Sequence, residues 1–189
     1  MNVKDQADTL RRLMGSRKAA PEAPVISVFL APEVRKARLF SPRELALYAR
    51  ARGAGFRVRD ESDPLAASPG NARVIRRLAA VSGDEVDVLA CYQRLKSLLP
   101  DLGADRSVKK MDVLVCVAVD GPDRESQGRR IFTQLFEACR RFLDVDLAYV
   151  GTVARGEKIR DCLAIEKYLI HCSSGSREGS KDAGCVIGR

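Results

Sequence analysis

The feature that most constrains the fold is an uninterrupted apolar run in the second half of the chain. This run, DVLVCVAV at 112–119, shows no alternation of polar and apolar residues. A strand with one face in water would alternate, so we expect this one to be buried on both faces, as in the centre of a parallel sheet. Because parallel strands need long crossover connections, helices should flank that sheet.

The segments around this run support an α/β fold. An amphipathic helix is predicted at 127–143, a strand follows at 145–153, and a last helix is predicted at 158–170. Such alternation is typical of α/β units with right-handed crossovers. The earlier part of the chain is expected to contain strands at 25–30, 56–59 and 86–89, and helices at 41–52, 68–81 and 92–99. We therefore predict the α/β class, with a mostly parallel sheet flanked by helices.

The ends of the chain differ in composition from this body. Residues 1–15 read as a short amphipathic helix, 16–24 as a linker rich in proline and charge, 25–170 as the α/β domain, and 171–189 as a flexible tail. A helix this short is marginal on its own in water, so it should dock on its own domain or on a partner.

Charge and hydropathy limit the classes of partner. The chain has 33 Lys and Arg against 25 Asp and Glu, a net charge of +8, which favours acidic partners. The arginines are spread along the chain, as on a solvated surface, so nucleic acid is not the expected partner. No apolar run is long enough to span a membrane, and no basic start precedes an apolar segment. We therefore expect a cytoplasmic protein.

The sequence lacks the usual constellations of an enzyme. The phosphate loop G-x-x-x-x-G-K-[ST] does not occur, and Gly156-Glu157-Lys158 is followed by isoleucine. Ala31–Lys36, after the first predicted strand, has no glycine, and its proline and glutamate would remove a donor and repel phosphate. The six cysteines form no C-x-x-C pair, and a lone His171 makes a zinc site or a histidine relay unexpected. The cysteines in apolar patterns should be buried thiols. We predict no catalytic activity, no cofactor, no metal and no nucleotide site.

The amino-terminal segment resembles a short element of a known family. Residues 5–11, DQADTLR, look like the D-Q-A-x-x-L-R element of the FlhG (or FleN) family, MinD/ParA-like proteins that control the number of flagella in polar flagellates. Stretches that resemble the carboxyl-terminal half of that family lie, in the same order, at 91–96, 112–119, 128–132, 141–151 and 159–163.

The resemblance implies a partner and a set of site residues. In the FlhG family the amino-terminal helix binds FlhF, a GTPase of the signal-recognition type, and stimulates its hydrolysis. By resemblance, the residues that would bind and activate such a GTPase are Asp5, Gln6, Ala7, Leu10 and Arg11. A glutamine amide can orient an attacking water, a small alanine permits close approach, and leucine and arginine would anchor the helix. The partner would also recruit the protein to the cell pole.

Several departures from the family keep other interpretations open. The phosphate loop, the first half of the family pattern and its carboxyl-terminal membrane helix are missing or unrecognisable, so we expect a degenerate, non-catalytic FlhG-like regulator of flagellar placement or number. Alternatively, Gln6 faces solvent and Leu10 packs on its own domain. A second alternative is a basic adaptor or transcriptional regulator that binds an acidic protein or DNA without affecting hydrolysis. Asp60-Glu61 and Asp84-Glu85 are interpreted as solvated turn residues.

Overall fold

The computed structural model describes residues 23–62, 73–99, 110–118, 121–143 and 145–175. These residues build one sheet of five parallel strands in the order β2-β1-β3-β4-β5. The α/β class that the sequence predicts is therefore confirmed. The strands are β1 (Val25–Leu30), β2 (Arg57–Asp60), β3 (Val74–Val81), β4 (Lys110–Val117) and β5 (Asp146–Ala154).

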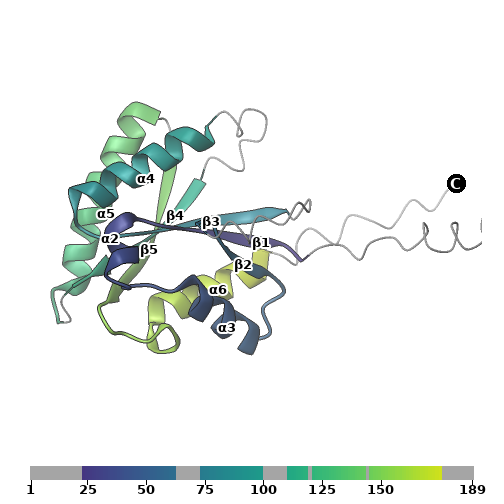
Figure 1. Ribbon diagram of the computed structural model, residues 1–189. Helices are drawn as coiled ribbons and strands as arrows, with labels where there is room; N and C mark the ends of the chain where they lie inside the picture. Colours follow the sequence, from purple (N-terminus) through teal and green to yellow (C-terminus); the bar gives the residue numbers. More distant parts are fainter. Residues whose placement is uncertain (1–22, 63–72, 100–109, 119–120, 144, 176–189) are drawn as a thin grey trace, which may run out of the picture.

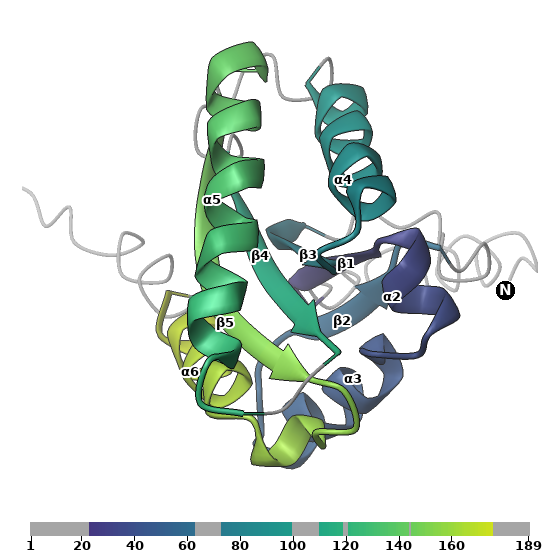
Figure 2. The ribbon, with the colours of Figure 1, turned by 90° about the vertical axis from the view of Figure 1, so that its left-hand side faces the viewer.

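Helices cover both faces of the sheet (Figure 1). Helices α4 and α5 lie on one face, α3 and α6 lie on the other, and the short α2 sits beside α4 where β1 ends. Figure 2 shows this end of the strands, with α5 crossing in front of β4 and β5. The helices are α2 (Pro32–Lys36), α3 (Pro42–Ala51), α4 (Glu85–Leu98), α5 (Arg124–Leu143), the 3-10 helix η4 (Ile159–Asp161) and α6 (Leu163–Gly175).

Strand β4 carries the core between the two helical layers. Every residue from Met111 to Val117 is buried, including Asp112, and the strand pairs with β3 on one side and β5 on the other. Both faces of the strand are thus covered by helices, which confirms the interpretation of the unalternating run. Buried rows of the neighbouring strands continue the same core, among them Ile26, Val28, Leu78 and Val153.

Strand β3 stands where the sequence predicts a helix, and that prediction is wrong. Apolar residues of 68–81 recur with a helical spacing, but Leu78 to Val81 form one run that is buried throughout. The segment pairs with β1 and β4 as an interior strand, and helices on both faces of the sheet bury these four successive residues. At the strand's start, Arg76 reaches Asp112 of β4 at 3.6 Å, so the charge is paired rather than solvated.

Helix α4 begins earlier than predicted and includes the residues taken for a strand at 86–89. Its buried row is Asp87, Cys91, Leu95 and Leu98, four positions on one helical face. Because the first member of this row is an aspartate, the apolar part of the row begins only at Cys91. The apolar residues Val86 and Leu89 point to solvent instead, with exposed fractions of 57% and 56%.

The remaining elements follow the sequence closely. Ser41 caps α3 by accepting the backbone N–H of Glu44, as its position before a proline predicts. The last predicted helix is split into η4 and α6, and α6 extends to Gly175, so the prediction of a flexible tail is wrong for 171–175. The rest of that tail, 176–189, lies outside the described residues, and the sequence did not predict α2.

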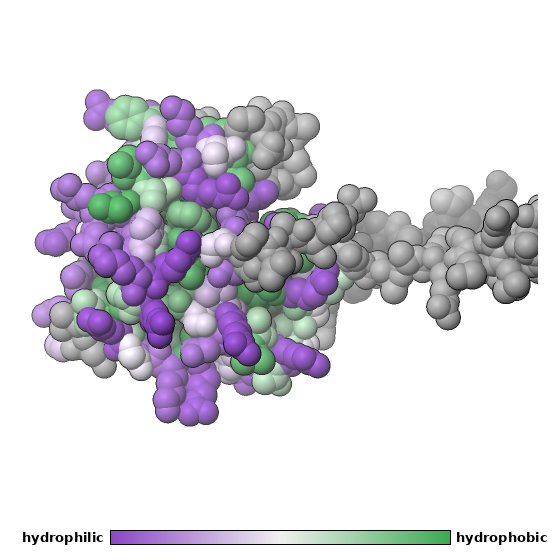
Figure 3. Space-filling view, viewed as in Figure 1, coloured by the Kyte–Doolittle hydropathy of each residue, from purple (hydrophilic) through white to green (hydrophobic). Residues whose placement is uncertain are grey.

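The coloured part of the surface in Figure 3 is mostly hydrophilic, with apolar patches in between. Exposed large apolar side chains occur on α3, α4, α5 and α6. None of the helices within the described ranges is long and apolar enough to cross a membrane.

Candidate functional site at the carboxyl ends of the strands

The residues that the resemblance assigns to GTPase activation lie outside the described part of the chain. They are Asp5, Gln6, Ala7, Leu10 and Arg11. Most of the predicted linker lies outside it as well, and only Ala23 and Pro24 are described before β1. The role of the five residues therefore stays a prediction. What the structure describes is the body to which they are joined at the start of β1.

The order of the strands points to one end of the sheet as the place for a ligand. The chain turns to opposite sides of β1 when it forms β2 and β3, and ligands of open parallel sheets bind beside such a reversal, at the carboxyl ends of the strands. A hollow of about 350 Å³ lies at this end. Its lining includes Glu33, Ser82, Asp84, Gln127, Ile131 and Arg155, from the loops and helices that follow β1, β3, β4 and β5.

A buried carboxylate occupies the centre of this end of the sheet. The Oδ1 atom of Asp87 accepts the backbone N–H of Glu33 at 2.7 Å, and its Oδ2 atom accepts the backbone N–H of Ser82 at 3.0 Å. The hydroxyl of Ser82 also donates to Oδ2, at 2.6 Å. Asp87 thus joins the start of α2 to the loop before α4, in the way a bound anion would.

The start of α2 has little capacity left for a phosphate group. Its first residue, Pro32, has no N–H, and the N–H of Glu33 is already donated to Asp87. The negative charge of Asp87 would also repel a phosphate at this position. The sequence predicted a poor phosphate loop here from the proline and the glutamate, but it did not identify Asp87.

A second carboxylate fills the turn after β5 in the same way. Glu157 accepts the backbone N–H of Ala154 at 2.9 Å and lies 3.2 Å from the guanidinium of Arg124. Gly156, with φ of +80°, makes this turn possible. The Gly-x-Lys sequence at 156–158 therefore forms a turn closed by its own glutamate.

The hydroxyl of Ser82 lacks the neighbours that activate a nucleophile. Its acceptor, Asp87, is also bound by two backbone N–H groups, so this carboxylate serves the fold. The single histidine, His171, lies on α6, where its Nε2 atom accepts a hydrogen bond from Arg76 at 3.0 Å. No imidazole is therefore available to Ser82 as a base.

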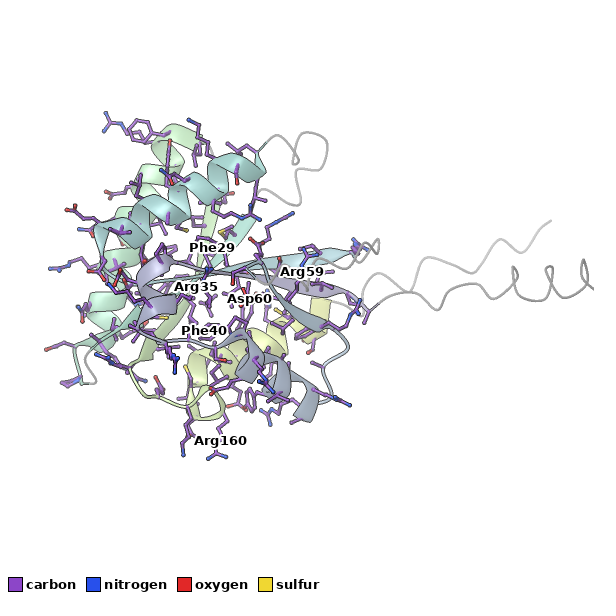
Figure 4. The ribbon with its side chains drawn as sticks, viewed as in Figure 1. Phe29, Arg35, Phe40, Arg59, Asp60 and Arg160 are labelled. Atoms are coloured by element: carbon purple, nitrogen blue, oxygen red, sulfur yellow. The ribbon has the colours of Figure 1, made fainter. Side chains whose placement is uncertain are left out.

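Glu61 corrects one expectation from the sequence. Its side chain is only 11% exposed, accepts from Arg94 at 2.7 Å and from the hydroxyl of Ser27 at 2.8 Å, and is not a solvated turn residue. Asp84 and Glu85 are exposed, as expected. In Figure 4, Arg59 and Asp60 lie close to the plane of the sheet at the end of β2.

The cysteines within the described residues are buried free thiols, as predicted for the four in apolar patterns, whereas the burial of Cys172 was not predicted because that residue was assigned to the tail. They are Cys91, Cys116, Cys139, Cys162 and Cys172. Burial raises the pKa of Cys116 to about 12 and those of Cys139 and Cys172 to about 11. Within the described ranges, no three His, Cys, Asp or Glu side chains group in a way that could hold a metal ion.

Comparison of the chain with protein-family models and with curated proteins finds no match.

Proposed function

We propose that this protein is a non-catalytic FlhG-like regulator, which binds a GTPase of the FlhF type and stimulates its hydrolysis of GTP. The residues in contact with the GTPase are Asp5, Gln6, Ala7, Leu10 and Arg11. The body carries this segment and takes no part in the chemistry. The protein acts on flagellar placement or number and reaches the cell pole through its partner.

The observation that carries the proposal is the carboxylate of Asp87 at the start of α2. A MinD-like ATPase needs backbone N–H groups and a lysine around the phosphates. Here the backbone N–H of Glu33 already donates to Asp87, and Pro32 has no N–H to donate. A body closed in this way favours a role through a partner's active site over hydrolysis of its own nucleotide.

The order of the later elements gives further support. The stretches that resemble the FlhG family fall on α4, β4, α5, β5 and the segment that contains η4 and the start of α6. They are consecutive parts of one sheet and its helices, so the resemblance follows a continuous structural unit and not scattered matches.

The test is a GTPase assay with an FlhF-type protein and two forms of this chain. The full chain should stimulate hydrolysis, whereas a form without residues 1–20 should not, although its unfolding midpoint is unchanged. Equal stimulation by both forms would contradict the proposal. A salt titration of the binding distinguishes this proposal from the alternative of a DNA-binding adaptor. The affinity for DNA falls steeply as salt rises, whereas the affinity of a helix held by an apolar anchor changes little.

A further inference from the structure

The sheet ends at β5, and one part of this edge strand is accessible. Strand β5 is last in the sheet order, so no described strand pairs with its outer edge. Residues Ala148, Tyr149 and Val150 are half-buried, whereas Gly151 to Ala154 are buried. Val150 is an extra residue in the ladder with β4, since Val113 pairs with Tyr149 and Leu114 with Gly151. This bulge confines further pairing to the first half of β5.

Helix α5 places a row of aromatic and basic side chains above this edge. Arg129, Phe132, Phe136 and Arg140 recur at intervals of three or four residues and therefore share one side of the helix. Tyr149 of β5 lies below them. We call these five residues the edge stripe.

Contacts within the edge stripe join α5 to β5. The rings of Phe132 and Phe136 stack with centroids 5.8 Å apart, and the ring of Tyr149 lies 5.2 Å from that of Phe132. The guanidinium of Arg129 lies 5.1 Å above the ring of Tyr149. The three rings are half-buried, and a shallow hollow of about 710 Å³ lies beside Phe136 and Arg140.

This combination fits a polypeptide partner in an extended conformation. An open strand edge offers backbone donors and acceptors that only another strand can match along its length. Tyrosine, phenylalanine and arginine at the same place are the residues enriched in the centres of protein interfaces. Nucleic acid would use the arginines and ring faces but not the strand edge.

The positive charge of this surface indicates that the partner segment is negatively charged. Helix α5 contains five arginines and two glutamates, and the whole chain has a net charge of +8. A second copy of the same chain would bring like charges together. The acids nearby are Glu125, 3.2 Å from Arg129, Glu137, which lines the hollow together with Arg140, and Asp146 at the start of β5. Because Glu125 already pairs with Arg129, the charge of Arg129 is open to a partner carboxylate only in part, and Arg140 is the main cation offered.

We propose that the first half of β5 accepts an acidic, extended segment of another protein as a sixth strand, held by the edge stripe. Backbone hydrogen bonds to β5 position the segment, its apolar side chains pack on Phe132 and Phe136, and its carboxylates face Arg129 and Arg140. The proposal does not rest on the proposed function, because it concerns the body and not residues 5–11.

The experiment measures fluorescence anisotropy of a labelled peptide of about eight residues that alternates glutamate and valine. The full chain should bind it, and the double variant Arg129→Glu/Arg140→Glu should bind at least about tenfold more weakly. Arg130→Glu is the matched control, since Arg130 is exposed but lies on another side of α5. An equal loss in the control would show a general charge effect and overturn the proposal.

A second peptide tests the pairing itself. It has the same side chains but methylated backbone nitrogens, and it should bind at least about tenfold more weakly because it cannot complete the ladder. Equal binding of the two peptides would overturn the proposal. So would tighter binding of a single-stranded oligouridine under the same salt, or a dimer of the chain that the acidic peptide does not disrupt.

Discussion

The carboxylate of Asp87 holds the backbone N–H of Glu33 at 2.7 Å, although 54 positions separate the two residues in the sequence. This contact ties α2 to α4 across the end of the sheet where β1 and β3 finish. It satisfies donors that would otherwise be buried without a partner, and it does so with a group that belongs to the chain.

Replacing this carboxylate should destabilise the fold. Asp87→Asn keeps the shape but turns an NH₂ group toward donors, so at least one buried N–H or hydroxyl loses its acceptor. We expect the free energy of unfolding in urea to fall by about 3 kcal/mol. Glu85→Gln, at an exposed position in the same turn of α4, should change it by less than about 0.5 kcal/mol. Similar values for both variants would show that Asp87 does not hold α2.

The close approach of α5 to β5 depends on Gly128. A Cβ atom at this position would lie 2.0 Å from Oγ1 of Thr152 and 2.8 Å from the hydroxyl of Tyr149. Gly128→Ala should therefore lower the free energy of unfolding by about 2 kcal/mol, and the added change Thr152→Ala should recover part of the loss. Gly121→Ala is the control, because nothing lies within 4 Å of its Cβ. An equally small effect at both glycines would contradict the packing described.

The buried thiols make the stability of the fold decrease at alkaline pH. Burial raises the pKa values of Cys139 and Cys172 to about 11 and that of Cys116 to about 12, from 9.0. Below pH 9 the thiols are protonated in both the folded and the unfolded chain. Above pH 9 the unfolded chain releases these protons first, so the stability that they contribute is lost as pH rises toward 11 and 12.

Two measurements check this expectation. The midpoint of urea unfolding should fall steadily from pH 9 to pH 11, and iodoacetamide should modify the five buried cysteines at pH 8 only after unfolding. Rapid modification of any of them in the folded chain would show that its thiol is accessible. A constant midpoint over this pH range would contradict the raised pKa values.

Patterns within a single element carried most of the information on the fold. The run at 112–119 identified β4 because a strand buried on both faces leaves a clear pattern, and the row Ile131, Leu135 and Cys139 identified α5. β3 was missed because its apolar residues also fit a helical spacing, and only the neighbouring strands decide between the two. Glu61 was missed because its partner, Arg94, comes from a distant helix.

The candidate site could be predicted only in part, for a similar reason. Pro32 and Glu33 already indicated that the segment after β1 is a poor phosphate site. Asp87 occupies the backbone donor at this site. In the sequence it is indistinguishable from an ordinary acidic residue in the first turn of a helix, because its contact with Glu33 exists only in the folded chain. The structure of this site depends on contacts between segments that are distant in the sequence, and such contacts cannot be recognised from a local sequence pattern.

The most direct test of the central claim is the rate of GTP hydrolysis by an FlhF-type GTPase with the full chain and with its variant Gln6→Ala. We predict that the variant loses stimulation by at least about tenfold, because the amide that orients the attacking water is gone. Asn2→Ala, which lies outside the 5–11 element, should stimulate like the unmodified chain. Equal turnover with Gln6→Ala and with the unmodified chain would contradict the account.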